Sequence, residues 1–119
     1  MESTSAIQHI VLYSFTDAEV LGEAVSLIKS LSARVLRNNQ PYILSIQCGS
    51  TRPSAPVRSL GYNLASVVTF ASDADRVYFI KNDPAHRELV EFVTGKLNKD
   101  ILVLDFIDGL GATVASDAC

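Results

Sequence analysis

Two histidines and one aspartate are the residues of this sequence best suited to acid–base chemistry. His86 lies just after an Asp-Pro pair typical of a helix start, so we expect its ring in a first turn, where the helix dipole disfavours an imidazolium. Asp105 interrupts the apolar run 101–107, and an ionised carboxylate there needs a partner. A carboxylate that sets the tautomer of a histidine is the usual equipment for general acid–base catalysis. We therefore take His86 with Asp105 as the candidate catalytic dyad.

Each of these residues also has an ordinary structural interpretation. Asp105 could lie near the open end of its strand, hydrated or bonded to backbone groups, and His86 could be a helix-end residue bonded to nearby backbone. We favour a hydrogen-bonded core residue for His9, and cavity wall rather than catalyst for Tyr13. Sequence alone does not separate the structural and functional interpretations of Asp105.

Strand alternation predicts that the candidate residues share one face of a sheet, because alternate side chains of a strand point the same way. That face would carry His9, Val11 and Tyr13 of a first strand, Leu64, Ser66 and Val68 of a third, and Ile101, Val103 and Asp105 of a last. This face would then bring four polar side chains into one apolar space: His9, Tyr13, Ser66 and Asp105.

The elements that position these residues follow the order strand, helix, strand, strand, helix pair, strand. The expected strands are 7–15, 42–48, 62–70 and 101–107; a long helix follows the capping-box spacing at 16–19, and two shorter ones start near Ser72 and Asp83. The Pro- and Ser-rich loop 50–61 is expected to be the most flexible interior segment. This order predicts a single α+β domain over residues 1–119, with a core at about 7–108 and a tail at 109–119 that could cross onto a partner subunit. The fold class is a ferredoxin-like four-stranded antiparallel sheet with helices on one face.

Helices on one face leave the other face of such a sheet uncovered. We expect the face with Val11, Leu64 and Val68 to be the uncovered one, and a second copy of the sheet is its simplest cover. The hydrophobic fraction of 48%, against 19% charged residues, is high for a short chain and supports a subunit interface. The predicted assembly is a homodimer.

Composition and missing motifs exclude several other classes. A net charge of −3, with ten Lys and Arg spread singly, argues against nucleic acid. We find no Gly-rich phosphate loop, metal-ligand spacing or Gly-x-Ser-x-Gly motif, and predict no metal and no cofactor. Cys48 and Cys119 are expected to be a buried thiol and a tail thiol. No apolar run approaches ~18 residues and the N-terminus lacks signal-peptide character, so we expect a cytoplasmic protein with no membrane partner.

Four segments together resemble the stress-responsive A/B barrel (Dabb) family. They are HIVLYSF at 9–15, VVTF at 67–70, DPAH at 83–86 and LVLDF at 102–106. The resemblance runs from about residue 9 to residue 107 and implies a ferredoxin-like fold, a homodimeric α+β barrel and a pocket between sheet and helices.

Members of that family include plant stress-induced proteins and a plant polyketide cyclase that closes a linear polyketide by aldol condensation without a cofactor. By position, the resemblance implies that its catalytic histidine corresponds to His86, its supporting aspartate to Asp105 and a pocket histidine to His9. The cyclase's catalytic tyrosine falls at Ile80, and a second pocket histidine falls at Leu64. We expect Tyr78 to point to a different side of its helix.

The leading hypothesis is a cofactor-independent cyclase or lyase acting on a small hydrophobic, polyketide-like carbonyl compound. His86 would be the general base, Asp105 would orient it, and Tyr13, Ser66 or His9 would bond the developing enolate oxygen. The apolar wall of the substrate site would consist of Val11, Leu64, Val68, Ile80 and Val103. One alternative is a non-catalytic stress-responsive homodimer that binds a small hydrophobic molecule, and another is a cofactor-free monooxygenase.

Overall fold

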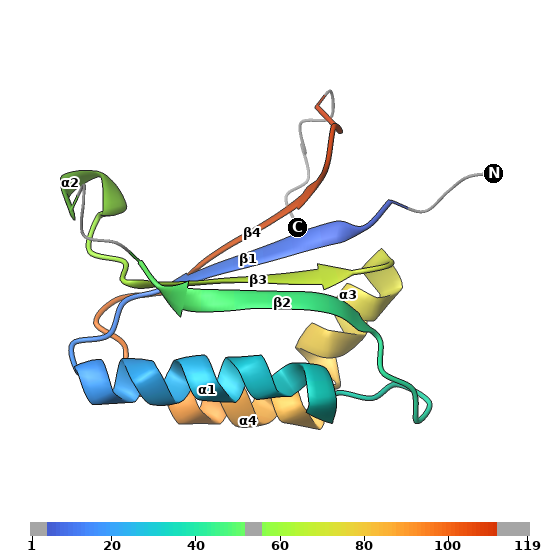
Figure 1. Cartoon of the computed structure of the whole chain (residues 1–119), viewed down its shortest axis with the longest axis horizontal. Coiled ribbons are helices and arrows are strands. Elements are labelled where there is room, and N and C mark those ends of the chain that lie inside the picture. The colour runs from blue at the N-terminus through green and yellow to red at the C-terminus, as the bar shows by residue number, and fades with distance from the viewer. Residues whose placement is uncertain (1–4, 52–55, 112–119) are drawn as a thin grey trace.

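A computed structural model describes residues 5–51 and 56–111 of the chain (Figure 1). Within these residues the elements are β1 (Ile7–Tyr13), α1 (Ala18–Arg34), β2 (Ile43–Ser50), α2 (Pro56–Ser59), β3 (Leu64–Phe70), α3 (Asp73–Lys81), α4 (Pro84–Val93) and β4 (Leu102–Ile107). The expected order is confirmed, with the short α2 added inside the loop predicted at 50–61. The flexibility expected of that loop falls partly on residues 52–55, which lie outside the described residues.

The four strands form one antiparallel sheet in the order β2-β3-β1-β4. Helices α1 and α4 lie side by side across one face, and α3 lies at the end of that layer (Figure 1). This is the ferredoxin-like α+β fold that the sequence predicted. In this register β1, between β3 and β4, places His9 opposite both Val68 and Asp105.

The helices cover the face of the sheet that we expected to be open. Val11, Leu64 and Val68 are 7%, 0% and 3% exposed and belong to the core beneath α1 and α4. The open face carries the alternate residues of each strand, including Leu104 and Phe106 of β4. The grouping of residues by face was right and the choice of covered face was wrong, because β1 and β4 are largely apolar on both faces and alternation alone does not show which face is covered.

Side-chain caps set where the helices begin. Asp17, rather than the preceding threonine of the expected capping box, caps α1 by accepting from the backbone N–H groups of Glu19 and Val20. Ser72 caps α3. After α1 the chain reverses at Asn38 and Asn39, whose positive φ angles of 55° and 63° suit a tight two-residue turn.

The start of α4 is anchored in the core. Asp83 is 2% exposed, accepts from the backbone N–H of Ala85 as the helix cap, and accepts a 2.5 Å hydrogen bond from the Tyr42 hydroxyl. Pro84 occupies the first helical position, as expected. This anchor fixes the first turn of α4 and therefore the place of His86.

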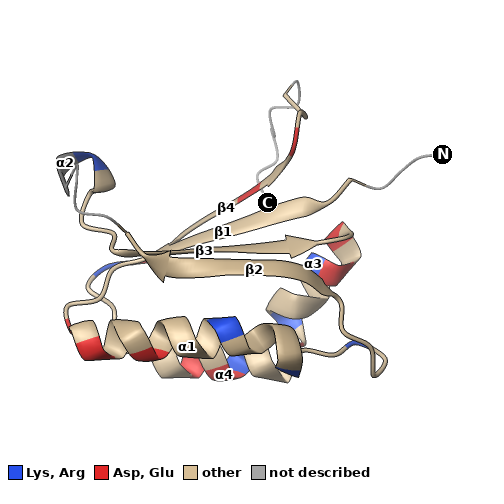
Figure 2. Cartoon of the chain, viewed as in Figure 1, with Lys and Arg blue, Asp and Glu red and all other residues tan. Residues whose placement is uncertain are grey.

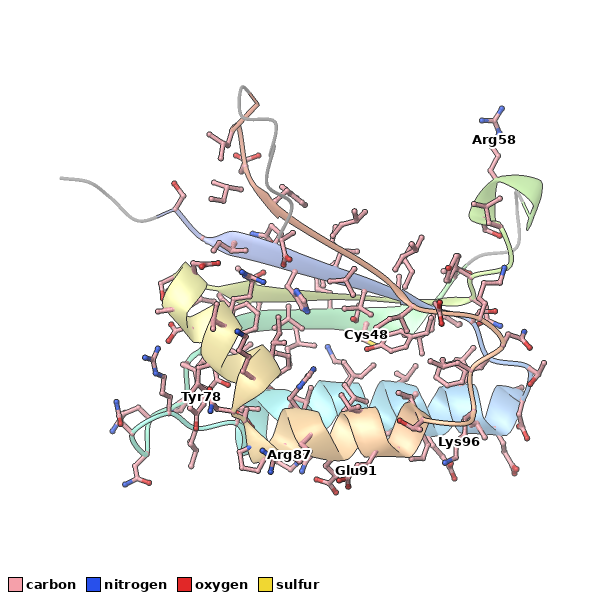
Figure 3. All side chains as sticks on the ribbon, turned by 180° about the vertical axis from the view of Figure 1, so that it is seen from behind. Cys48, Arg58, Tyr78, Arg87, Glu91 and Lys96 are labelled. Carbon is pink, nitrogen blue, oxygen red and sulfur yellow. The ribbon has the colours of Figure 1, made fainter. Side chains whose placement is uncertain are left out.

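Charged side chains concentrate on the helices and loops (Figure 2). Among the four strands, Asp105 is the one residue of the Asp, Glu, Lys and Arg types. Figure 3 shows side chains filling the layer between the sheet and the helices, with Arg87 and Glu91 on the side of α4 away from the sheet. In the described part of the chain, no helix has the length and apolar character needed to cross a membrane.

Candidate functional site

A cavity of about 240 Å³ lies between the β1–β4 edge of the sheet and helices α3 and α4. Three of its lining residues bring polar groups, namely His9, Tyr13 and His86. The rest of its wall is apolar and is formed by Val11, Ile101 and Val103 of the sheet side and by Ile80, Leu89, Val90 and Val93 of the helix side. The cavity can therefore take a small, mostly apolar molecule that offers a few hydrogen-bonding atoms.

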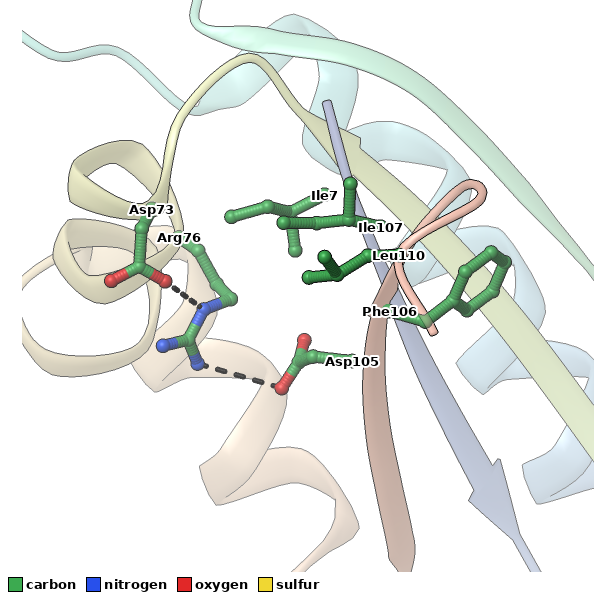
Figure 4. A pocket seen from close by; sticks show the side chains of 7 residues that line it. All are labelled: Ile7, Asp73, Arg76, Asp105, Phe106, Ile107 and Leu110. Atoms are coloured by element: carbon green, nitrogen blue, oxygen red, sulfur yellow. Dashed lines mark hydrogen bonds and ion pairs between the residues drawn. The ribbon is translucent and has the colours of Figure 1, made fainter. Parts of the chain in front are cut away.

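The structure brings most of the predicted site residues to this cavity. Ser66 and Val68 line a smaller hollow of about 20 Å³ that shares His9, Tyr13 and His86 with it. Leu64 is fully buried in the core and lines neither space. Asp105 lines a neighbouring surface pocket (Figure 4).

His9 is a buried ring held by a carboxylate. Its Nδ1 lies 2.7 Å from Oδ1 of Asp105, and because an ionised carboxylate only accepts, Nδ1 carries the proton and donates it. The ring also lies near Phe70 and Phe79, with centroid distances of 6.0 and 6.3 Å. His9 is thus satisfied, as the structural interpretation expected, and it also lines the cavity.

Asp105 pairs with His9, so the expected dyad between Asp105 and His86 does not form. The second oxygen of Asp105, Oδ2, lies 3.5 Å from Nη1 of Arg76. The reason is the strand register: β4 sets Asp105 directly opposite His9 on β1, and opposed side chains of paired strands are natural partners. Asp105 therefore has the partner that it needs on the adjacent strand of the sheet, β1.

His86 lies in the first turn of α4, as expected, and is half-buried. Burial, followed by the electrostatic interaction with the nearby His9 ring, lowers its pKa, whereas Asp83 acts in the opposite direction. Its ring packs on Phe79 at a centroid distance of 4.6 Å, and among the described residues no group hydrogen-bonds to it. No buried side-chain nitrogen or oxygen in the described part of the chain lacks a partner, so the unbonded ring nitrogens of His86 are not sealed in the core. A neutral, unbonded imidazole can accept a proton from a ligand.

The Tyr13 hydroxyl is the third polar group of the cavity. Burial raises the pKa of Tyr13 to about 12, although the hydroxyl of Ser66 acts in the opposite direction. Tyr13 therefore stays protonated over the ordinary pH range and remains a hydrogen-bond donor. The sequence predicted that Tyr13 is mainly part of the cavity wall. In the structure its hydroxyl is also a hydrogen-bond donor.

Ile80 lines the cavity and is 37% exposed, which places an apolar side chain next to His86. Tyr78 faces elsewhere, as expected: its ring meets Tyr42 edge-on at 5.5 Å and lies under the Arg37 guanidinium at 5.4 Å. No tyrosine of α3 reaches the cavity.

Sequence reasoning missed several residues of this region. Leu89, Val90 and Val93 belong to the apolar stripe of α4, so the stripe was the signal that could have assigned them to the cavity. Arg76 was missed as well, and the only pointer to it was the need of Asp105 for a partner. Among the described residues, no group of three or more His, Cys, Asp or Glu is arranged to hold a metal ion.

Cys48 does not line this cavity. Cys48 is half-buried rather than buried, and burial raises the pKa of its thiol to about 11. Cys119 and the rest of the tail from residue 112 lie outside the described residues.

Comparison with known proteins places the chain in a family. The sequence pattern of the stress responsive A/B barrel domain (Dabb) matches residues 7–108. The chain belongs to the Dabb family. A relative of this Dabb protein, the fusaristatin A biosynthesis cluster protein of Gibberella zeae, is 28% identical over 100 residues, which cover 84% of this chain and 70% of that protein.

Solved structures similar to this Dabb protein share its fold. The hydroxynitrile lyase from Passiflora edulis superposes with a TM-score of 0.71 at 20% identity, over 95% of this chain and 100% of that one. A protein from Arabidopsis thaliana gives 0.69 at 24% identity, over 92% and 98%. A dimeric ferredoxin-like protein of unknown function from Thermobifida fusca gives 0.67 at 20% identity, over 90% and 94%. At these identities the likeness shows the ferredoxin-like fold.

Proposed function

We propose that this Dabb protein is a cofactor-independent enzyme of the lyase or cyclase type that acts on a small hydrophobic carbonyl compound, with His86 as its general base. One observation carries the proposal: the unbonded ring of His86, with a lowered pKa, lines an apolar cavity that also contains His9 and Tyr13. A base of this kind, opposite hydrogen-bonding groups in an apolar space, suits proton abstraction next to a carbonyl.

The size of the cavity limits the substrate. A water molecule occupies about 30 Å³ of liquid, and an apolar cavity of about 150 Å³ holds a benzene molecule. The cavity here, about 240 Å³, therefore has room for one ring with a short substituent. A longer polyketide-like chain would fit only with its tail outside the opening.

The proposed reaction balances without an added oxidant or reductant. His86 takes a proton from the carbon next to the carbonyl, and the electron pair of that C–H bond forms an enolate. In the cyclase direction the enolate carbon attacks a second carbonyl carbon, a C–C bond forms, and the resulting alkoxide takes the proton back from His86. In the lyase direction the same steps run in reverse and a C–C bond breaks.

One neighbouring group suits the developing negative charge, and another can accept a hydrogen bond from the substrate. The Tyr13 hydroxyl remains a donor because burial keeps it protonated. Because Nδ1 of His9 carries the proton and donates it to Asp105, Nε2 carries the lone pair of the ring and can accept a hydrogen bond from a substrate hydroxyl. Asp105 thus supports His9 rather than His86, and Ser66 acts through Tyr13 from the inner hollow.

The names of similar proteins agree with this class of reaction. One relative is named for a biosynthesis cluster and one structural neighbour is a hydroxynitrile lyase. They support a biosynthetic or lyase-like role and leave the substrate to be found by experiment.

We also propose that the protein works in the cytoplasm as a homodimer joined through the open face of its sheet. Three structural neighbours are described as dimeric. The open face exposes Leu102, Leu104 and Phe106 by 43%, 59% and 49%, and a second copy would cover them.

The decisive experiment compares the native protein with His86→Ala and with Arg87→Ala, a control on the outer side of the same helix turn. Thermal shifts are measured with phenolic, β-diketone and polyketide-like compounds, followed by turnover assays on every compound that binds. A ligand at about 100 times its Kd adds about 2.7 kcal/mol to the stability of the native protein. Loss of turnover in His86→Ala alone supports the proposal, and full turnover in that variant contradicts it.

Ile80 supports a second candidate, a non-catalytic stress-responsive homodimer that binds a small hydrophobic molecule. The side chain at this place in the cavity is apolar, where the plant cyclase of the family carries its catalytic tyrosine. This candidate predicts ligand binding without turnover, and equal binding by the native protein and His86→Ala.

A further inference from the structure

Arg76 of α3 connects the carboxylate that holds His9 to a second carboxylate (Figure 4). Its Nε lies 2.8 Å from Oδ1 of Asp73, and its Nη1 lies 3.5 Å from Oδ2 of Asp105. Asp105 therefore uses one oxygen for His9 and the other for Arg76. The four side chains form a chain of contacts from the surface to the cavity.

Asp105 needs such a second contact because of where it lies. In the described sheet β4 pairs with β1 alone, and the side chain of Asp105 is 31% exposed, compared with 5% for His9. A carboxylate on an edge strand can turn towards water and leave the histidine. The Arg76 guanidinium on Oδ2 opposes that rotation, and its bond to Asp73 restrains the guanidinium in turn.

We propose that Arg76 is a positioning residue of the site: by holding Oδ2 of Asp105 it keeps Oδ1 on Nδ1 of His9 and so maintains one ring tautomer. The consequence at the cavity is that Nε2 of His9 stays available to a ligand. The effect of this tautomer on catalysis rests on the proposed function, whereas the presence of the tautomer does not depend on that function.

The surroundings of His9 contain few groups that could replace this arrangement. The titratable groups near the ring are Asp105 of β4, His86 of α4 and Tyr13 of its own strand, and Arg76 of α3 acts through Asp105. Among the described residues neither His86 nor Tyr13 hydrogen-bonds to the ring, and the other ring neighbours are Phe70 and Phe79. Asp105 is thus the group that sets the tautomer.

Ring nitrogen chemical shifts test the proposal directly, because the chain has only two histidines. The ¹⁵N shifts of both rings are recorded in the native protein at a pH where both are neutral, and His86→Gln assigns the remaining ring to His9. The variants are Arg76→Gln, Arg76→Lys and the control Arg37→Gln. Arg37 also pairs with a carboxylate of α3, Asp75 at 2.7 Å, but has no contact with Asp105.

The native protein and Arg37→Gln should show His9 in the Nδ1–H tautomer. In Arg76→Gln the two ring shifts of His9 should move towards each other, as expected for exchange between tautomers, and Arg76→Lys should restore part of the difference. Unchanged His9 shifts in Arg76→Gln overturn the proposal. If Arg76→Gln does not fold, Asp73→Asn tests the same chain of contacts and should give a smaller change in the same direction.

Turnover measurements keep this result separate from the proposed function. If His86→Ala keeps full turnover while Arg76→Gln shifts the His9 ring, the proposed function fails and the positioning role is supported. If His86→Ala abolishes turnover while Arg76→Gln leaves the His9 ring unchanged, the positioning role fails alone. Phenol serves as the binding probe because its hydroxyl can donate to Nε2 of His9, and its thermal shift should fall in Arg76→Gln but not in Arg37→Gln.

Discussion

Nδ1 of His9 and Oδ1 of Asp105 lie 2.7 Å apart on neighbouring strands. His86 lines the same cavity from the helix side with no hydrogen-bonding partner among the described residues. The two histidines therefore differ in kind: one is fixed by a carboxylate, and the other is open to a ligand. In the proposed reaction His9 orients the substrate through Nε2 and His86 takes its proton.

A double-mutant cycle on unfolding free energies should find coupling between Asp105 and His9. Asp105→Ala and His9→Ala each remove one partner of their mutual hydrogen bond, and contacting residues typically couple by about 0.5–3 kcal/mol. The matched cycle with His86→Gln should give a coupling within error of zero, because Asp105 does not contact His86. Urea unfolding measures both cycles, and a larger coupling to His86 would contradict the assignment.

The lowered pKa of His86 predicts how stability depends on pH. The unfolded chain binds a proton near the ordinary pKa of about 6.5, whereas the folded protein binds it only at lower pH. Between these two pKa values the unfolded state carries more protons, so the free energy of unfolding rises with pH through this window and the contribution is complete above about 6.5. It is lost as pH falls through the folded pKa.

Unfolding curves at several pH values check this dependence, with His86→Gln as the comparison. The variant should lack the part of the slope that belongs to His86. Because the base must be neutral, turnover should also persist below the ordinary pKa of histidine and fall only at lower pH. A turnover midpoint above about 6.5 would show that His86 is not the titrating base.

Sequence patterns predicted the elements, the order of the fold and the shared face of the site residues. They did so because strand alternation and helix caps are local: Asp83 and Pro84 start α4 for reasons that lie within four residues of His86. The partner of Asp105 depended on the register between β1 and β4, which brings together His9 and Asp105 from 96 positions apart in the chain. Likewise, when a strand is apolar on both faces, packing across the whole domain decides which face the helices cover.

Tyr13→Phe should reduce turnover by about 10²–10³-fold if its hydroxyl bonds the developing oxyanion. Because the pKa of Tyr13 is raised to about 12, the loss should be independent of pH across the range in which the protein is folded. Tyr62→Phe is the control, since that hydroxyl donates to the backbone carbonyl of Asp100 on the surface. Steady-state kinetics of both variants decide the matter, and equal rates would remove Tyr13 from the mechanism.

Leu104→Glu should dissociate the proposed dimer. Leu104 is 59% exposed in the single chain and lies on the open face of the sheet, where a carboxylate would be buried against the partner. Leu60→Glu is the control, because Leu60 is 64% exposed but lies in the turn before β3. Sedimentation velocity should give a monomer for the first variant and a dimer for the second, and a dimer in both would place the interface elsewhere.

Asp83→Ala should destabilise the protein more than the removal of an exposed cap. The change removes the cap of α4, worth about 1 kcal/mol, and leaves the buried Tyr42 hydroxyl unpaired at a further cost of about 1–3 kcal/mol. Asp17→Ala removes only the exposed cap of α1 and should cost about 1 kcal/mol. Urea unfolding compares the two variants, and equal losses would contradict a structural role for the Tyr42–Asp83 bond. Since the same bond anchors the first turn of α4, the loss in Asp83→Ala should also weaken ligand binding at His86.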